Sequence, residues 1–132
     1  MDKVSVKTSS RVELLDITDK VRSVVSKSGL KEGVCFLFCP HTTAGLSINE
    51  NADPSVKSDI ANALNKLIPA NAGYGHSEGN SDAHIKSSLL GSSLAVFVEA
   101  GNLALGTWQG IYFCEGDGPR SREVWIRLVE SR

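Results

Sequence analysis

The chain has 132 residues, of which 41% are hydrophobic and 22% charged, and its formal net charge is −1 at pH 7. A chain of this size and composition forms a single globular domain, residues 1–132, with a sizeable core. The even charge balance argues against a broad basic face for nucleic acid, and no apolar run approaches the roughly 18 residues of a membrane span. Residues 1–5 lack signal-peptide character, so we expect a cytoplasmic protein that binds neither nucleic acid nor membranes.

Two strands and a helix are predicted at the start of the chain. Apolar and polar residues alternate in Val4–Lys7 and again in Arg11–Asp16, and a polar turn separates them. Helical spacing of valines follows over Asp19–Ser28, with Thr18 as the expected N-cap and Gly29 as the C-terminal stop.

The next apolar segment, Val34–Cys39, is short and continuous, which predicts a strand buried on both faces. Cys35 and Cys39 should share one face of it, because their separation is even. The third cysteine, Cys114, also lies in an apolar run. We therefore expect three buried free thiols, in keeping with a reducing compartment.

The middle of the chain predicts a short strand at Leu46–Asn49 and then two helices. Asp53 and Pro54 are a strong helix start, an N-cap followed by proline at the first helical position. One apolar face of that helix is formed by Val56, Ile60, Leu64, Leu67 and Ile68. After a glycine-rich loop over 71–80, Ser81 or Asp82 caps a further helix that ends at Gly91.

The last third of the chain predicts strands at Leu94–Glu99, Gln109–Glu115 and Arg122–Val129, with a two-residue hairpin turn at Gly101-Asn102. Strands therefore come in adjacent pairs, and about three helices are interposed without regular βαβ alternation. This order favours an α+β fold with packed, mostly antiparallel or mixed sheets, in a sandwich or barrel-like arrangement.

All three histidines lie in polar segments outside the predicted core. His41 follows the buried strand, His76 lies in the glycine-rich loop, and His84 falls in the first turn of the third helix. Three imidazoles match the ligand count of an open catalytic zinc site, and a helix N-terminus favours a neutral imidazole. The sequence therefore predicts a divalent metal ion, zinc above others, or else three polar surface histidines.

Polar residues near His41 add further candidates. Glu50 is either a solvated loop acid or a catalytic base or fourth metal ligand, whereas Asp53 is explained as an N-cap. Thr42 and Thr43 either bond the backbone of a turn or donate to an anionic substrate.

The third polar region combines glycines with arginines. Thr107 and Gln109 stand among glycines, and Arg120 and Arg122 follow a second glycine-rich turn. Guanidinium groups bind phosphate oxygens in a forked geometry, and glycines let the backbone approach. The alternative is a β-turn with exposed arginines, in which Arg120 pairs with an acid of its own turn. No Walker or Rossmann fingerprint is present.

Five motifs in register, spread over nearly the whole chain, resemble the YjbQ family. They are His41-Thr42-Thr43-Ala44, Asn49-Glu50 with Asp53-Pro54, Glu78-Gly79-Asn80 with Asp82-Ala83-His84, Gly106-Thr107-Trp108-Gln109, and Asp117-Gly118-Pro119-Arg120 with Arg122. One position departs, since Gly116 stands where the resemblance leads us to expect a large apolar residue.

The resemblance implies an α+β fold, a homotrimer with its site at or near a subunit interface, and secondary thiamine-phosphate synthase activity. That reaction joins a pyrimidine diphosphate to a thiazole phosphate. On this hypothesis His41, His76 and His84 hold the metal ion, and Glu50 is a base or fourth ligand. Arg120 stabilises the departing pyrophosphate. Phosphate is bound by Thr42, Thr43, Thr107, Gln109, Arg120 and Arg122. The alternatives are a metal-assisted hydrolase and a non-enzymatic trimeric module whose histidines hold a structural ion.

Overall fold

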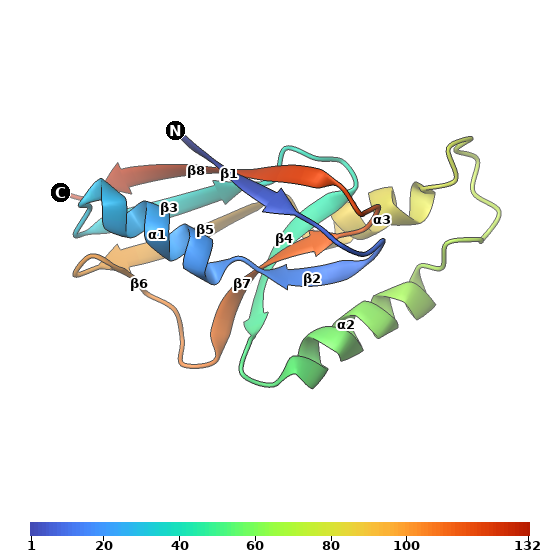
Figure 1. The fold of residues 1–132 in the computed structure, drawn as a ribbon, viewed down its shortest axis with the longest axis horizontal. Coiled ribbons are helices and arrows are strands. Elements are labelled where there is room, and N and C mark those ends of the chain that lie inside the picture. The colour runs from blue at the N-terminus through green and yellow to red at the C-terminus, as the bar shows by residue number, and fades with distance from the viewer.

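The structure, a computed structural model, describes residues 1–132 and contains eight strands and three helices (Figure 1). In chain order these are β1 (Asp2–Lys7), β2 (Glu13–Asp16), α1 (Thr18–Ser28), β3 (Gly33–Phe38), β4 (Ala44–Glu50), α2 (Pro54–Leu67), α3 (Ser81–Leu90), β5 (Ser93–Glu99), β6 (Asn102–Leu103), β7 (Gln109–Glu115) and β8 (Ser121–Glu130).

The strands form two antiparallel sheets that curl into a half-barrel. The larger sheet has the order β1-β8-β3-β5-β6, and the smaller has the order β2-β7-β4. This arrangement confirms the predicted α+β class with antiparallel sheets and three helices. None of the three helices combines the length and the hydropathy that crossing a membrane would require.

The hydrophobic core lies between the two sheets and α1. Leu37 and Ile126 enter it from the larger sheet, Phe113 from β7, and Val21 and Val25 from α1. The three cysteines are free and buried, as predicted. Burial raises the pKa of the Cys35 thiol to about 11 and that of Cys114 to about 12, so both remain protonated at neutral pH.

The prediction that Val34–Cys39 is buried on both faces is wrong. Cys35, Leu37 and Cys39 face the core, whereas Phe36 and Phe38 are exposed. Because every residue of the run is apolar, its pattern does not indicate which face points inward. The outer face of the larger sheet is apolar as a result, and the Phe38 and Trp125 rings lie on it with centroids 5.8 Å apart.

Two helix starts differ by one residue from the sequence prediction. Ile17, and not Thr18, is the N-cap of α1, and the Thr18 N–H donates instead to Asp16 Oδ1 at 2.9 Å. Asn80 is the N-cap of α3, one residue before the predicted cap at Ser81 or Asp82. The cap of α2 is confirmed, because the Asp53 carboxylate accepts from the Ser55 N–H at 2.9 Å.

Two further boundaries also shift. Strand β2 begins at Glu13, because Arg11 and Val12 lie in a bend. The hairpin between β5 and β6 pairs Glu99 with Asn102. Its two turn residues are therefore Ala100 and Gly101, both with positive φ, one position before the predicted pair.

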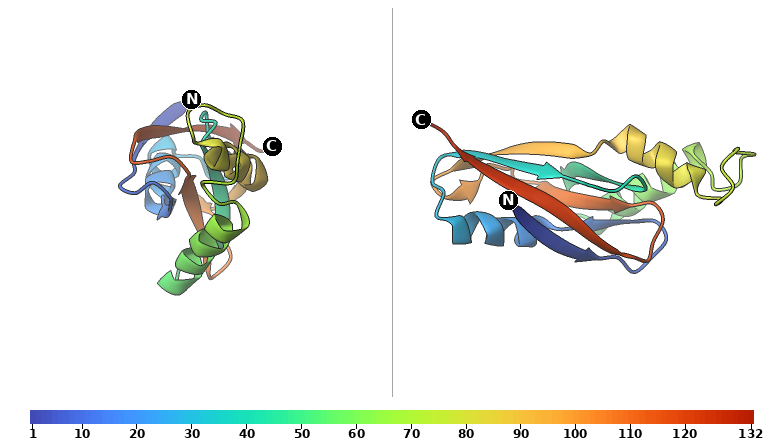
Figure 2. Two further views of the ribbon diagram at one scale, coloured as in Figure 1. Left: turned by 90° about the vertical axis from the view of Figure 1, so that its right-hand side faces the viewer. Right: turned by 90° about the horizontal axis from the view of Figure 1, so that it is seen from above.

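Helices α2 and α3 and the loop between them lie at one end of the sandwich, away from the C-terminus (Figures 1 and 2). Helix α2 has no fully buried residue, and Ile60 packs only against a small cluster around Leu14 and Tyr112. Helix α3 packs closely on β4, where the Ser87 hydroxyl donates to the Ala44 carbonyl at 2.7 Å.

Gly116 explains how α3 comes so near to β7. A Cβ at this position would lie 2.9 Å from the Thr43 carbonyl oxygen and 3.2 Å from Ala83 of α3. There is no room for the large apolar residue that the family resemblance led us to expect, because α3 occupies that space.

Candidate functional site

A polar cavity of about 410 Å³ lies beside the N-terminus of α3, where the segment after β3 meets the turn between β7 and β8. It is lined by Pro40, His41, Thr42, Thr43, His76, Glu78, Asn80, His84, Asp117, Arg120 and Arg122. Three segments far apart in the sequence thus meet at one place, residues 40–43, 76–84 and 117–122. All three predicted histidines, both predicted threonines of the first motif and both predicted arginines are among the lining residues.

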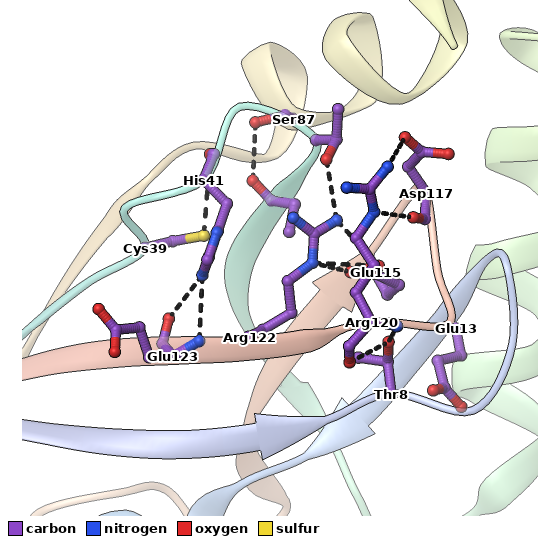
Figure 3. A network of polar contacts seen from close by, with 12 residues as sticks. Thr8, Glu13, Cys39, His41, Ser87, Glu115, Asp117, Arg120, Arg122 and Glu123 are labelled. Atoms are coloured by element: carbon purple, nitrogen blue, oxygen red, sulfur yellow. Dashed lines mark hydrogen bonds and ion pairs between the residues drawn. The ribbon is translucent and has the colours of Figure 1, made fainter.

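The His41 imidazole is held by the backbone of β8 (Figure 3). Its Nε2 accepts from the Glu123 N–H at 3.0 Å and lies 3.1 Å from the Glu123 carbonyl oxygen. Burial and the nearby Arg122 guanidinium lower the pKa of His41, so the ring is neutral at pH 7. With Nε2 engaged by the backbone, Nδ1 is the nitrogen left to a ligand.

His76 and His84, which also line the cavity, are in mutual contact. Their ring centroids are 5.4 Å apart in an edge-to-face arrangement. His76 Nε2 lies 3.9 Å from Glu78 Oε2. His84 is one turn into α3, so the helix fixes the direction in which its side chain leaves the backbone.

The three imidazoles share the cavity without forming a ready set of metal ligands. No group of three or more His, Cys, Asp or Glu side chains is arranged to hold a metal ion. The predicted convergence of their ring nitrogens on one point is therefore not seen in this structure, and their role as metal ligands stays a prediction.

Arg122 is buried and its guanidinium is bound by Glu115 (Figure 3). Nε donates to Glu115 Oε2 at 2.8 Å, and Nη2 donates to Glu115 Oε1 at 2.9 Å and to Thr43 Oγ1 at 2.8 Å. The pair is nearly dry, since the Arg122 side chain is 5% exposed and that of Glu115 is 0% exposed. Only Nη1 of Arg122 remains for a ligand.

Arg120 is half-exposed and is oriented by Asp117. Its Nε donates to the Asp117 carbonyl at 2.7 Å and its Nη2 to Asp117 Oδ2 at 2.9 Å. The same carboxylate oxygen accepts from Asn80 Nδ2 at 2.8 Å, which ties this turn to the start of α3. Arg120 therefore pairs within its turn, as the structural alternative expects, and still presents Nη1 to the cavity that it lines.

Three predicted site residues lie elsewhere. Glu50 pairs with Gln109 at the far end of β4, whereas Ala44 and Glu115 pair at the end beside the cavity. Six residues of strand separate the two ends, which is about 20 Å. Gln109 closes its own turn by accepting from the Gly106 N–H at 2.8 Å. The single chain therefore does not bring Glu50, Thr107 or Gln109 to the histidines, and their functional roles remain predictions.

Four polar residues of the site escaped the sequence prediction, and one of them, Glu78, lines the cavity beside His76. Asn80 and Asp117 line the cavity and bond to each other across 37 positions of sequence, and Glu115 lies beneath it. Asn80 and Asp117 both belong to motifs of the family resemblance, so that signal was available. Nothing in the sequence indicated that Glu115 would be buried against Arg122.

Comparison with known proteins shows which family the chain and its fold belong to. A family model described as UPF0047 protein YjbQ-like matches residues 2–131. A UPF0047 protein of Methanocaldococcus jannaschii is 54% identical over 127 residues, which cover 96% of this chain and 92% of the relative. YugU of Bacillus subtilis, another UPF0047 protein, is 48% identical over 127 residues, which cover 96% of each chain.

Solved structures of similar proteins have the same fold. An uncharacterised conserved protein of the YjbQ/UPF0047 family from Clostridium acetobutylicum superposes with a TM-score of 0.95 at 52% identity, covering 98% of this chain and 100% of the other. A hypothetical protein from Aeropyrum pernix gives a TM-score of 0.94 at 36% identity, covering 98% of each chain. The chain belongs to the YjbQ/UPF0047 family.

Proposed function

We propose that this protein is a metal-dependent enzyme that acts on a small phosphorylated substrate, with the histidine cavity as its active site. The observation that supports this proposal is the lining of that cavity, in which every residue except Pro40 has a polar side chain. It combines three imidazoles with two guanidinium groups, the donor sets that suit a divalent ion and a phosphate. A cavity of about 410 Å³ accommodates a small metabolite.

The arginine side of the cavity is suited to phosphate. Arg120 is held in place by the two hydrogen bonds that it donates to Asp117, so little conformational entropy is lost when its free N–H groups meet an anion. Arg122 offers Nη1, and Thr42 adds an exposed hydroxyl to the lining of the same cavity. Charge that develops on a departing phosphate group would be stabilised here.

The histidine side has the donor chemistry for a divalent ion. His41 is held neutral, the form in which an imidazole binds metal, and Glu78 adds a carboxylate beside His76. His41, His76 and His84 would hold the ion, with zinc the expected metal. A bound ion would supply Lewis acidity at a phosphate or leaving-group oxygen.

The reaction that we propose is thiamine-phosphate synthesis, as the family resemblance implies, either as the main or as a side activity. The substrate's bond to pyrophosphate breaks while a bond to the thiazole forms, and the arginines hold the departing anion. The alternative is hydrolysis of a phosphorylated metabolite at the same site, with water in place of the thiazole. In either case we expect the enzyme to work in the cytoplasm.

One assay separates these reactions. Purified protein with added zinc is incubated with the pyrimidine diphosphate, with and without the thiazole phosphate. We expect thiamine phosphate only when both substrates are present. Release of phosphate or pyrophosphate at the same rate without the thiazole would favour the hydrolase. No turnover of either kind would favour the non-enzymatic module.

The metal prediction is tested by content and by position. We expect about one divalent ion per chain in protein purified without chelators, and its loss in His84→Ala. An anomalous-scattering map would place the ion among the three histidines. Lys20→Ala, an exposed change on α1, is the matched control and should leave metal content unchanged. A map without a peak in the cavity of metal-supplemented crystals would contradict the proposal.

Arg120→Ala is expected to weaken phosphate binding by about 2–3 kcal/mol and to leave bound metal unchanged, because a charged contact is lost and no imidazole is touched. Arg120→Lys should recover only part, since a single ammonium cannot reproduce the guanidinium fork. Calorimetric titration with inorganic phosphate measures both. If Arg120 only holds its turn, Arg120→Ala lowers the melting temperature and leaves phosphate affinity the same within error.

We also propose that the protein is a homotrimer, as the family resemblance implies, and the outer face of the larger sheet supports an assembly. Phe36, Phe38, Phe97 and Val129 are exposed on adjacent strands. Contiguous apolar surface of this kind marks an interaction site in most soluble proteins. Glu50, Thr107 and Gln109 would reach a histidine cavity only from a neighbouring copy.

Phe97→Glu is expected to dissociate the assembly, because Phe97 is 67% exposed in the single chain and a buried carboxylate there would be unpaired. Light scattering at micromolar concentration should give three times the chain mass of 14.1 kDa for the wild type and a smaller species for the variant. Ser26→Glu on the exposed side of α1 is the control for added charge. A wild-type species of 14.1 kDa would refute the trimer.

A further inference from the structure

A second polar cavity, of about 430 Å³, lies on the other side of α3 from the histidines. Asp82 and Lys86 of α3 form its floor, and Arg11 and Asn65 stand at its walls. Two residues turn a helix by about 200°, so His84 leaves α3 on nearly the opposite side from Asp82. Helix α3 therefore separates the two cavities, and nothing in the proposed reaction uses the second one.

The floor of this cavity is a buried ion network. Asp82 Oδ1 accepts from Arg11 Nη2 at 3.0 Å, and Asp82 Oδ2 accepts from Arg11 Nη1 at 3.0 Å and from Lys86 Nζ at 3.3 Å. Lys86 Nζ also donates to Asn65 Oδ1 at 2.7 Å. The Lys86 side chain is only 4% exposed and that of Asp82 is 0% exposed, so the two charges are fixed in place.

Some polar groups around this network have a hydrogen-bond partner in the structure and others have none. Both Asp82 oxygens and the Asn65 amide oxygen already accept hydrogen bonds. The remaining groups of these four side chains are donors, namely the third N–H of Lys86, the Nδ2 group of Asn65, and Nε with the second N–H of each Nη of Arg11. The Ser10 hydroxyl, which also lines the cavity, can both donate and accept. The network holds two cations against one carboxylate, and Asp117, which also acts on Arg11, is itself paired with Arg120.

We propose that this second cavity binds a small oxyanion. A lining in which free N–H donors outnumber the one free hydroxyl, and which carries one excess positive charge, complements a carboxylate or phosphate group and disfavours a cation. The buried Lys86 is preorganised for this role, because its side chain has already lost its rotational freedom in the folded protein. The inference stands apart from the proposed reaction, since none of its residues lines the histidine cavity.

The test follows phosphate at each cavity separately by NMR. Inorganic phosphate is titrated into the Arg120→Ala protein, in which the histidine cavity is weakened, and the side-chain signals of Asn65 Nδ2 and Arg11 Nε are recorded. We expect saturable shifts of both signals. Acetate at equal ionic strength should produce the same shifts if any oxyanion is accepted, and none if the site requires phosphate.

Arg11→Gln tests whether the Arg11 guanidinium contributes to anion binding. Asp82 still has Lys86 as its partner in this variant, so we expect the fold to be preserved. We expect phosphate binding at Asn65 to weaken roughly tenfold or more. Arg22→Gln, which breaks an exposed pair on α1, is the matched control and should change nothing.

Two results would overturn the inference. One is that Asn65 and Arg11 signals do not move at phosphate concentrations that saturate the histidine cavity of the wild type. The other is equal shifts of Asn65 in Arg11→Gln and in its parent. Failure of the proposed active site would appear differently, as unmoved His84 and Thr43 signals in the wild type.

Discussion

Replacing Glu115 by alanine is expected to lower the free energy of unfolding by about 3–5 kcal/mol. Glu115 is the only carboxylate bound to Arg122, whose side chain is 5% exposed, and the variant leaves that guanidinium buried without its counter-ion. The cost arises from desolvation of the unpaired charge rather than from the lost attraction alone. Urea denaturation followed by circular dichroism measures the change.

The double variant Glu115→Gln, Arg122→Met separates charge from packing. Removal of both ions leaves no unpaired charge, so we expect it to be more stable than Glu115→Ala despite carrying two changes. Glu78→Ala, at an exposed position on the cavity rim, should alter stability by less than about 0.5 kcal/mol. A Glu115→Ala protein as stable as wild type would show that solvent reaches Arg122.

Asp82→Ala is the second change for which we expect about 3–5 kcal/mol of destabilisation. The carboxylate is fully buried and serves both Arg11 and Lys86, so its removal leaves the nearly dry Lys86 ammonium with only an amide oxygen. Lys86→Met in the same background should restore part of the loss. Asp19→Ala breaks an exposed i,i+3 pair and is expected to cost at most a few tenths of a kcal/mol.

The same residue makes stability depend on pH. The hydrogen bonds from Arg11, opposed by burial and assisted by Lys86, hold the pKa of Asp82 below its usual 3.8. Its contribution is thus complete above about pH 4 and is lost as the pH falls through the lowered folded-state value. Stability curves of wild type and Asp82→Ala should run parallel near neutral pH and approach each other in acid. Parallel curves throughout would contradict the pairing.

The fold was predictable where a short sequence motif is compatible with only one local backbone structure. Gly29 ends α1 with a positive φ, and Asp53 with Pro54 begins α2, because both motifs act through their own backbone. The sequence pattern failed where the surroundings of a strand determine which of its faces is buried. Phe36 and Phe38 look like core residues in sequence, yet they face outward on a sheet whose outer surface nothing in the single chain covers.

The sequence predicted most of the residues that line the cavity, but it did not predict which other residues would lie beside them. The three histidines and Arg120 do meet, although they come from separate segments. Glu50 was expected beside them because it lies close to His41 in sequence. An extended strand carries it to the far end of the sheet, since each residue of β4 adds about 3.4 Å.

The absence of a side chain at Gly116 lets the first turn of α3, which carries His84 of the histidine cavity, pack close to β7. A Cβ of residue 116 would lie only 3.2 Å from Ala83 of α3, and His84 is the next residue of the same turn. Any larger residue at 116 would push this end of the helix outward and carry the His84 imidazole away from Thr43 and Arg122. A position that does not line the cavity would therefore control where His84 lies, and we expect a graded series of side chains at residue 116 to change the shape of the cavity step by step.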